Sequence, residues 1–449
     1  MIQLYCASWV LPVSNAPISG GAIAVDADRI IAVGVKSLLQ AQFPQAPARE
    51  FPDSAIIPGL INSHSHLELT AMRGFLENEE GDFFAWLRKL TIARIERMTE
   101  DDLYVSAAWG ACEAARAGVT CFADASDSGE TSMRALKDTG LRGIVYQESF
   151  GPDRRLVQQN FEKLQQKVAR LEELETALVT CGVSPHAPYT VCGPQLELIS
   201  RFAIDEGLPL MMHAAETEME VAFIRDGCGP FADGLRNRGI EWQAQHTSTI
   251  RHLERHGVLA AKPLLAHCIK VDEADIDLIS ETDSSIAHCP KSNAKLGHGV
   301  APLAGFLKKG IAVGFGSDSM ASNNNCDLLE EARFGGMIAR ATNNQSFINA
   351  AELLQTATAG AARAIGLQNQ IGELREGLQA DFAVVSLKGT HQQPIYDVSD
   401  SLIFASSGRD VTMTVVAGRE VHSEGRINTV DEERLRARVN EVAEKLSHR

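Results

Sequence analysis

The sequence predicts an α/β protein: a (β/α)8 barrel of the TIM type with a small β-sandwich built from the N- and C-terminal segments. From about residue 58 to 370, apolar runs alternate with long amphipathic helical patterns, which is typical of repeated βα units and a parallel sheet. Before and after this region, short apolar runs broken by Gly, Asp and Pro indicate strands without intervening helices. A chain of 449 residues also suits a barrel plus a smaller accessory layer.

The two ends of the chain have the texture of β structure. In residues 1–57 the adjacent segments GAIAVDA and RIIAVGV look like a hairpin, and IGELREGLQADFAVVSLKG and VTMTVVAGREVHSEGRI follow after about residue 370. We expect residues 1–57 and 371–430 to pair into one composite β-sandwich beside a barrel of residues 58–370. A charged helix is expected over residues 431–449.

Eight apolar runs in the central region are candidate barrel strands, and most of them end in His, Asp or Glu. Chemistry collects at the C-terminal ends of barrel strands, so these ends are where an active site is expected. The stretches between them are helical: one helix is expected to begin at a Thr99 cap and to stop at Gly118, and GPQLELISRFAIDEG is similar. The runs are AIIPGLINSH, GVTCFAD, RGIVYQE, ALVTCGVSPH, LPLMMHAAE, PLLAHC, SSIAHCP and IAVGFGSD.

Composition excludes several classes of protein. A formal net charge of -16 and a pI near 5.3, with no cluster of Lys and Arg, argue against a nucleic-acid or anionic-membrane binder. No apolar run reaches the length of a membrane-spanning helix, and the start MIQLYCASWVLPV lacks the charged region and cleavage site of a secretory signal. Nine Cys without a regular framework fit a reducing compartment. We therefore expect a soluble, cytoplasmic protein.

The strand ends offer a metal site. His64 and His66 lie two residues apart at the end of the first strand, so their side chains share one face and can grip one cation. His213 ends the fifth strand and Asp318 the eighth. Three imidazoles and a carboxylate suit one divalent metal, zinc first, with iron or manganese as alternatives, and leave a position for water.

A single metal is favoured over two. A two-metal site of this kind commonly needs a bridging Lys or Glu at a middle strand, and the fourth strand offers neither. Glu148 on the third strand is the one acid that leaves the alternative open. Water on the metal becomes acidic enough to supply hydroxide near neutral pH.

Three residues are candidates for moving protons. Glu216 follows His213 by three residues and can take a proton from the metal-bound water and deliver it to a ring nitrogen or a leaving amine. The alternative for Glu216 is a surface acid at a helix N-terminus. His267, at the end of the sixth strand, is placed to orient the attacking hydroxide, and Asp318 can share the water proton as well as the metal.

Substrate contacts are less sharply indicated. His186, in SPHAPYT at the fourth strand end, is interpreted as a substrate contact rather than a ligand. His288, at the seventh strand end, is a second candidate, with a role in shaping its loop as the alternative. Trp86, Arg73 and the polar run SNNN at 322–325 are candidate pocket lining, with surface or packing roles as the alternative.

These residues resemble the amidohydrolase superfamily, specifically the branch of methylthioadenosine/S-adenosylhomocysteine deaminases, aminodeoxyfutalosine deaminases, guanine deaminases and triazine chlorohydrolases. The resemblance covers nearly the whole chain. It implies metal ligands at His64, His66, His213 and Asp318, a proton-shuttling acid at Glu216 and a water-orienting histidine at His267. The motifs that carry it are PGLINSHSH, SPHAPYT, HAAE, LLAHC, HCPKSNAKLGHGVAPL, GFGSDSMASNNN and GELREGLQADFAVV.

Within this branch, SPHAPYT and the NNN run look like the deaminases of adenosine derivatives, whose substrate-binding histidine would be His186. Deaminases that act on methylthioadenosine usually carry a Glu late in the helix after the first strand. Here that stretch reads FFAWLRKLTIARIERM, with Arg94 and Ile95 near the expected place and Glu96 only approximately in register. HSHLELT followed by FFAWL looks more like the aminodeoxyfutalosine deaminases. The resemblance therefore implies hydrolytic removal of the 6-amino group of an adenosine derivative, with release of ammonia.

Two alternatives remain. Another amidohydrolase could act on a C–N or C–Cl bond of a purine, pterin or triazine ring, but a chlorohydrolase would typically lack the acid three residues after the fifth-strand histidine, so Glu216 favours deamination. A non-catalytic binding barrel would have a broken ligand set, whereas here the set is complete. The resemblance also implies a purine nucleoside-like substrate and a homodimer or larger homo-oligomer.

Overall fold

The computed structural model describes residues 1–342 and 347–447, and each of the eight central runs contains a strand. These strands form two four-stranded parallel sheets, which we call the first and second half sheets. The first contains β5 (Leu60–Ser65), β6 (Val119–Ser126), β7 (Arg142–Ser149) and β8 (Val179–Pro185). The second contains β9 (Met211–Ala214), β10 (Leu264–His267), β11 (Ser285–His288) and β12 (Val313–Phe315).

The half sheets meet at two seams. Isolated parallel bridges join Ser65 to Asp318 and Val183 to Leu210. The amide of Asp318 donates to the carbonyl of His64 at 2.9 Å. In the described residues the predicted barrel therefore appears as two hydrogen-bonded halves with a single bridge at each seam, and not as one continuously paired cylinder. The strands that flank the seams in the second half, β9 and β12, are only 4 and 3 residues long, which leaves few residues to pair.

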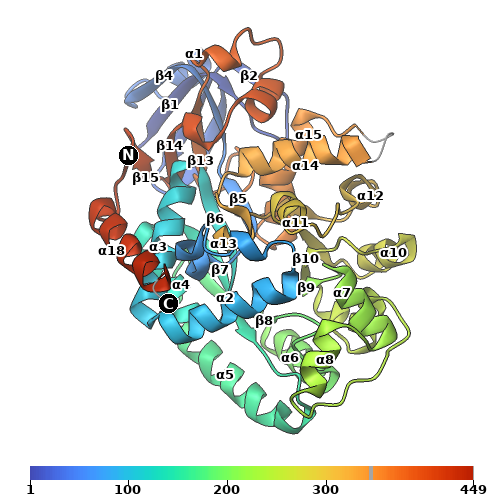
Figure 1. The fold of residues 1–449 in the computed structure, drawn as a ribbon. Coiled ribbons are helices and arrows are strands. Elements are labelled where there is room, and N and C mark those ends of the chain that lie inside the picture. The colour runs from blue at the N-terminus through green and yellow to red at the C-terminus, as the bar shows by residue number, and fades with distance from the viewer. Residues whose placement is uncertain (343–346, 448–449) are drawn as a thin grey trace.

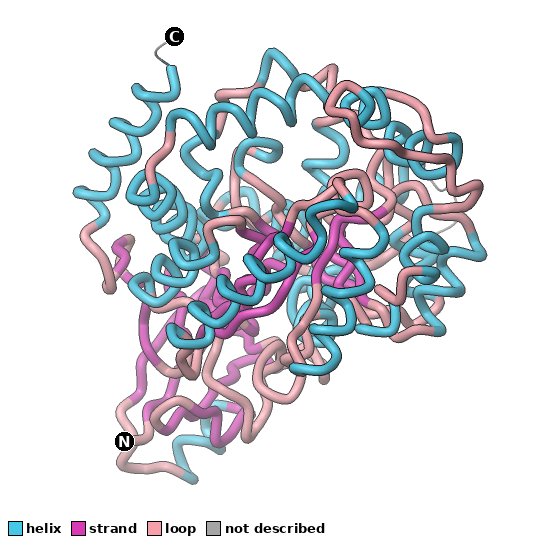
Figure 2. Tube along the Cα trace, turned by 90° about the horizontal axis from the view of Figure 1, so that it is seen from below, coloured by secondary structure: helices cyan, strands magenta, loops and turns pink. Residues whose placement is uncertain are grey.

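Helices surround the strands (Figure 2). The predicted helix after Thr99 is α3, and the Thr99 side chain caps it by accepting from the amide of Asp102. The α-helices are α1 (Lys36–Gln42), α2 (Phe83–Arg97), α3 (Glu100–Arg116), α4 (Gly129–Thr139), α5 (Val157–Leu174), α6 (Gly193–Glu206), α7 (Glu218–Val221), α8 (Pro230–Arg236), α9 (Thr249–Arg255), α10 (Glu273–Glu281), α11 (Pro290–Lys295), α12 (Leu303–Lys308), α13 (Met320–Asn323), α14 (Leu328–Thr342), α15 (Ala350–Gln355), α16 (Ala361–Ala364), α17 (Val398–Asp400) and α18 (Glu432–Ser447). The 3-10 and π segments are η1 (Leu67–Met72), η2 (Glu77–Glu79), η3 (Arg154–Leu156), η4 (Ala222–Asp226), η5 (Leu259–Ala261), η6 (Thr356–Gly360), η7 (Thr390–Gln392), η8 (Ser401–Ala405) and η9 (Gly408–Asp410).

Strands from both chain ends share one sheet, in the order β16-β15-β14-β13-β4-β1-β2-β3. The predicted hairpin is the antiparallel pair β2–β3, and β13 pairs antiparallel with β4, which joins the C-terminal strands to the N-terminal ones (Figure 1). Hydrogen bonding makes this a single sheet, while the boundaries of the predicted sandwich domain stay a prediction. Its strands are β1 (Gln3–Val10), β2 (Ile18–Asp26), β3 (Arg29–Val35), β4 (Ala48–Pro58), β13 (Phe382–Ser386), β14 (Val411–Val416), β15 (Arg419–Ser423) and β16 (Arg426–Ile427).

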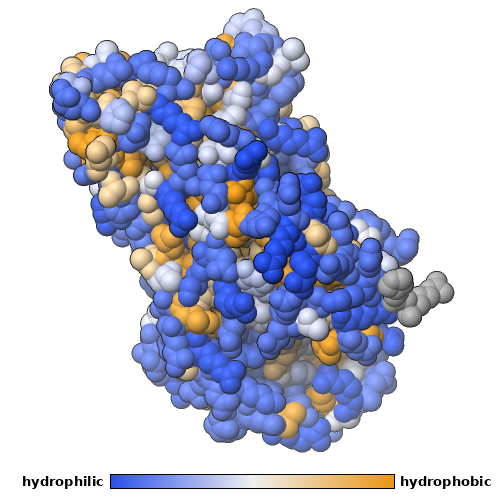
Figure 3. All heavy atoms as spheres, turned by 90° about the vertical axis from the view of Figure 1, so that its left-hand side faces the viewer, coloured by the Kyte–Doolittle hydropathy of each residue, from blue (hydrophilic) through white to orange (hydrophobic). Residues whose placement is uncertain are grey.

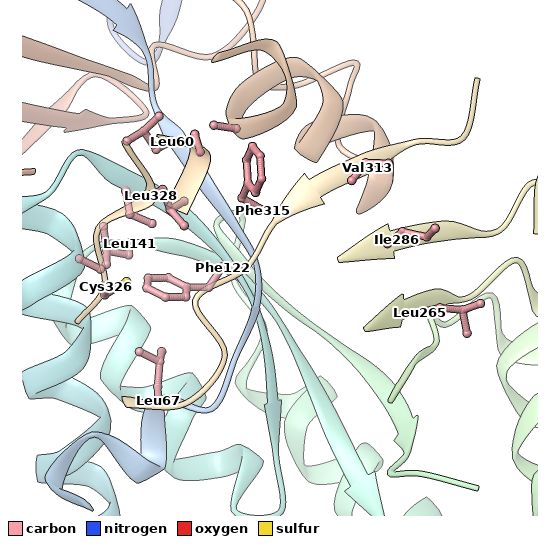
Figure 4. Packing of buried hydrophobic residues seen from close by; sticks show 14 of the residues in the cluster. Leu60, Leu67, Phe122, Leu141, Leu265, Ile286, Val313, Phe315, Cys326 and Leu328 are labelled. Carbon is pink, nitrogen blue, oxygen red and sulfur yellow. The ribbon is translucent and has the colours of Figure 1, made fainter. Parts of the chain in front are cut away.

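The largest apolar core extends from the half sheets to the surrounding helices and to the sheet of the chain ends. Phe122 of β6, Phe315 of β12 and Leu60 of β5 are buried in it with residues of α14 and of the end sheet (Figure 4). A buried ion pair of Arg142 and Asp381, with Nε and Oδ2 at 3.0 Å, ties the start of β7 to the residue before β13. The end sheet is thus fixed to the first half sheet by both apolar and ionic contacts.

The surface seen in Figure 3 is mostly hydrophilic, with apolar residues in separate patches. Among the described residues, no helix is both long enough and apolar enough to cross a membrane.

Candidate metal centre and active site

The C-terminal ends of both half sheets line a cavity of about 460 Å³. Most of the residues predicted for the site meet here, although they come from distant parts of the chain. His64 lies behind the wall and is fully buried. The predicted residues that line the cavity are His66, Trp86, His186, His213, Glu216, His267 and Asp318.

The four predicted ligands bring their donor atoms together. His66 Nε2 and His213 Nε2 are 3.2 Å apart. Asp318 Oδ1 lies 3.6 Å from His64 Nε2 and 3.6 Å from His66 Nε2. His64 Nε2 is buried and has no hydrogen-bond partner in the structure, as expected of a nitrogen whose lone pair coordinates a cation. Three imidazole nitrogens and one carboxylate oxygen therefore fit a divalent metal.

Neighbouring groups orient two of these ligands. His213 Nδ1 lies 2.8 Å from the carbonyl oxygen of His186, a bond that places the proton on Nδ1 and leaves the Nε2 lone pair free. The hydroxyls of Ser292 and Ser322 donate to Asp318 Oδ2 at 2.6 and 2.9 Å, which leaves Oδ1 toward the histidines. Protein groups thus set the orientation of His213 and Asp318.

Burial keeps the imidazoles in the form that binds metals. It lowers the pKa values of His64, His66 and His213 to about 4 from the ordinary value of 6.5. These rings are neutral near pH 7, and only a neutral imidazole has the lone pair that a metal needs.

Glu216 and His267 lie beside the ligands. Glu216 Oε1 is 3.9 Å from His267 Nε2, and His267 Nδ1 is held 2.9 Å from Asn293 Oδ1. Burial opposes ionisation of Glu216, but the charge of His267 and contact with His298 lower its pKa to about 2. Burial lowers the pKa of His267, but the charges of Glu216 and Asp318 outweigh it and raise that pKa. Glu216 is thus ionised at neutral pH and can accept a proton.

His186 and Glu148 also line the cavity. His186 Nδ1 is 2.9 Å from Thr190 Oγ1, and its Nε2 lies 3.9 Å from Glu148 Oε1. That oxygen is also 4.0 Å from His66 Nδ1, is buried and has no hydrogen-bond partner in the structure. Burial raises the pKa of Glu148 well above its usual value, and the charges of Glu68 and Asp127 raise it further. The placement of His186 is compatible with the predicted substrate contact.

Several other candidates are placed differently. His288 is buried against Phe315, with ring centroids 5.9 Å apart, and is not among the described residues that line the cavity. Its substrate-binding role stays a prediction. Arg73 also lies off the cavity wall and forms an ion pair with Glu113.

The predicted pocket role of the SNNN run is not supported by its position, because Ser322, Asn323, Asn324 and Asn325 are not among the described residues lining the cavity. The hydroxyl of Ser322 donates to Asp318, a predicted ligand. The Asn323 amide bonds the carbonyl of Ser317 at 2.7 Å, and Asn324 bonds Glu77 and Lys295. Short amide side chains here satisfy loop backbone and neighbouring charges instead of reaching the cavity.

Helix α2 contributes Trp86, Thr91 and Arg94 to the wall, whereas Glu96 is exposed and does not line it. Each nitrogen of the Arg94 guanidinium donates one hydrogen bond: to Glu68 at 2.8 Å, to Asp127 at 3.1 Å and to Ser128 at 2.9 Å. The end of α2 thus places the cation Arg94 in the cavity wall. The Glu that methylthioadenosine deaminases usually carry late in this helix has no counterpart among the described residues of the wall.

The sequence interpretation missed His298. Its Nδ1 lies 3.2 Å from Glu216 Oε1, although the two residues are far apart in the chain. The only sign of it in the sequence is its place in HCPKSNAKLGHGVAPL, a motif that indicates the family but not the role of this histidine.

The chain is similar to known proteins over nearly its whole length. The model of the amidohydrolase family matches residues 55–421. The chain is 30% identical to a 5-methylthioadenosine/S-adenosylhomocysteine deaminase of Pelotomaculum thermopropionicum over 434 residues, covering 96% of this chain and 94% of the relative. It is 32% identical to the same-named protein of Symbiobacterium thermophilum over 435 residues, covering 95% and 94%.

The structure also resembles a crystal structure of an adenosine deaminase from Xanthomonas campestris with bound zinc. The TM-score is 0.86 at 26% sequence identity, over 99% of this chain and 98% of that one. The family match, the relatives and the ligand cluster lead to one conclusion. The chain belongs to the amidohydrolase family and is a hydrolase that acts on carbon–nitrogen bonds.

Proposed function

We propose that this protein is a metal-dependent hydrolytic deaminase that removes the 6-amino group of an adenosine derivative and releases ammonia. The observation that carries the proposal is a pair of overlapping groups of possible ligand atoms, one of His64, His66 and Asp318 and one of His64, His213 and His267, beside the carboxylate of Glu216 at one cavity. The names of the relatives, deaminases of two adenosine derivatives, support the choice of reaction.

We propose one divalent metal, zinc first and iron or manganese as alternatives, held by His64, His66, His213 and Asp318. A metal held by this set lowers the pKa of water enough to supply the nucleophile near neutral pH. A second ion would need Glu148 and His186, but His213 is the third member of that group and its one free nitrogen already belongs to the first set. The donor count therefore supports a single ion.

Glu216 carries the protons. Water supplies the oxygen that bonds to C6 of the ring, and the ionised carboxylate accepts the proton that this oxygen loses. Glu216 then delivers a proton to the ring nitrogen. The hydroxyl now on C6 gives its remaining proton to the amino group, the bond from C6 to that group breaks, ammonia leaves, and the ring keeps a carbonyl. His267, held by Asn293, donates a hydrogen bond that orients the nucleophile.

The rest of the cavity suits a flat, partly polar ring system. Phe83 and Trp86 stack with centroids 5.9 Å apart on one wall, and Phe150 lies over His186 on another at 4.6 Å. Trp86 Nε1 is buried without a hydrogen-bond partner, as is Glu148 Oε1, and both belong to residues that line the cavity. Aromatic faces with a few polar groups are typical of small-molecule sites, and a nucleoside-like ring would suit them.

Among adenosine derivatives we favour the aminodeoxyfutalosine type over methylthioadenosine or S-adenosylhomocysteine. Glu96 is turned to solvent, and Arg94 with its three bonded partners occupies the wall. No carboxylate of late α2 is therefore available to hold a pair of ribose hydroxyls.

The test is ammonia release by the metal-loaded protein from methylthioadenosine, S-adenosylhomocysteine, adenosine, aminodeoxyfutalosine and guanine, with chloride release from a chlorotriazine measured beside it. Selective ammonia release from aminodeoxyfutalosine is expected, and chelator-treated protein should be inactive until zinc is restored. Chloride release, or silence with the adenosine derivatives, would contradict the proposed reaction.

A further inference from the structure

We propose that His298 is a positioning residue: its Nδ1–H holds the Glu216 carboxylate in its ionised form and in its reactive orientation. This inference rests on the proposed deaminase function, because it concerns the residue that moves protons there. His298 lies in the loop between α11 and α12, outside every strand end that the barrel pattern marks as chemical.

One asparagine contacts both histidines that lie beside the carboxylate: the ring of His267 and the backbone of His298. The side-chain oxygen of Asn293 lies 2.9 Å from His267 Nδ1, and the backbone carbonyl of the same residue accepts from the amide of His298 at 2.9 Å. Both rings then approach the same oxygen, Glu216 Oε1: His298 Nδ1 at 3.2 Å and His267 Nε2 at 3.9 Å. His298 is therefore the nearer of the two.

The surroundings leave His298 with one polar role. Its side chain is 5% exposed, as is that of Glu216, and its ring packs edge-on against Phe83 with centroids 4.6 Å apart. Neither ring nitrogen completes a hydrogen bond of good geometry in the structure. A buried imidazole without a partner is costly, so the carboxylate at hydrogen-bond length is the group that offsets this cost. The proposed bond therefore needs one of the two side chains to rotate from this position.

Such a bond acts on Glu216 in two ways. A donor to the carboxylate favours its charged form, which is the form that accepts a proton from the nucleophile. Occupying Oε1 also leaves Oε2 for the proton that moves. His298 keeps its own proton throughout, so no further acceptor is needed.

The first test compares His298→Phe with His298→Asn in the metal-loaded protein, on the substrate that the wild type deaminates. Phenylalanine keeps the ring contact with Phe83 but removes the donor, whereas the asparagine amide can stand in for Nδ1–H. For His298→Phe we expect kcat to fall about 10- to 100-fold, as for other residues that orient a reacting group, with KM and zinc content nearly unchanged. The acidic limb of its kcat/KM profile should move to higher pH, and His298→Asn should recover most of both.

A matched control is His422→Phe, which alters another buried histidine, in β15 of the end sheet. This variant should keep the wild-type profile. If the acidic limb of His298→Phe coincides with that of the wild type, or if His298→Asn is as impaired as His298→Phe, the positioning role is wrong and His298 serves packing alone.

A second measurement does not depend on turnover. Infrared difference spectra between pH values report the carboxylic acid band of Glu216, which is assigned by its loss in Glu216→Gln. In His298→Phe this band should appear at higher pH than in the wild type. Identical titration in the two proteins would overturn the inference even in an active enzyme, whereas an inactive wild type with a shifted band would overturn only the deaminase proposal.

Discussion

The two half sheets divide the work of the site unequally. The first half has strands of 6 to 8 residues and supplies His64, His66 and His186, whereas the second has strands of 3 or 4 residues and supplies His213, Glu216, His267 and Asp318. Backbone strain follows the same division. Along residues 60–185, all of them described, only glycines have positive φ.

In the second half, four residues other than glycine have a positive backbone φ, which such residues rarely adopt. They are Ala215, His267, Cys268 and Asp318, with φ of +52°, +73°, +46° and +57°. Hydrogen bonds to neighbouring strands hold these turns: Cys268 donates to the carbonyl of Ala214 at 3.0 Å and Asp318 to that of His64 at 2.9 Å. The regular half is a frame, and the strained half aims the reactive groups.

Glu216→Gln should separate chemistry from metal binding. The amide cannot accept the proton from the nucleophile, so kcat should fall roughly 10³-fold while zinc content stays near one per chain. Activity by ammonia release and metal by elemental analysis check this. His64→Ala, from the first half, is the opposite control and should lose the metal itself. Full activity in Glu216→Gln would show that Glu216, from the second half sheet, does not move the protons.

Replacing both Ser292 and Ser322 by Ala should loosen Asp318. Without the two hydroxyls, Oδ2 is free to turn toward the cation and the carboxylate loses its fixed orientation, so zinc affinity should fall about 10- to 100-fold. Competition with a chelator measures this. Unchanged affinity would mean that the left-handed backbone at Asp318 suffices to aim the carboxylate.

His186→Ala concerns a substrate contact from the first half. We expect KM to rise roughly tenfold with kcat and zinc content little changed, because the loss of one hydrogen bond weakens ground-state and transition-state binding alike. Steady-state kinetics decide the matter. A fall in kcat instead would show that the first half also takes part in the chemistry.

Opposite dependences of stability on pH should distinguish one buried group from each half. Burial lowers the pKa of His252 to about 4. Between pH 6.5 and 4 the unfolded chain therefore binds more protons than the folded chain, and the free energy of unfolding decreases as the pH is lowered. Burial raises the pKa of Asp124 to about 7, so the folded chain binds the extra proton and stability rises as pH falls below 7.

Urea unfolding at several pH values, for the wild type against His252→Phe and against Asp124→Asn, isolates each group. The difference in free energy of unfolding between the wild type and each variant should change with pH, with opposite sign for the two variants. Each change should be on the order of 1 kcal/mol between pH 7 and 5. Parallel curves would mean that neither group titrates differently on folding.

The regular features were readable from the sequence because their causes are local. Each apolar run yielded a strand, and the histidines and acid at the strand ends converged because parallel strands deliver their C-terminal ends to one edge. The two-half character of the barrel was not readable, since each seam depends on a bridge between distant residues such as Ser65 and Asp318. His298 was missed for the same reason: its loop has no periodic pattern, and only tertiary packing brings it to Glu216.

The pairing of β4 with both β1 and β13 has a consequence for biosynthesis. Strand β4 is complete once residue 58 has left the ribosome, but its partner β13 begins at residue 382, so one edge of β4 waits while more than three hundred residues are translated. An unpaired edge invites pairing with another nascent chain. We therefore expect a chain truncated before residue 382 to expose this edge of β4 and to depend on chaperones to stay dispersed.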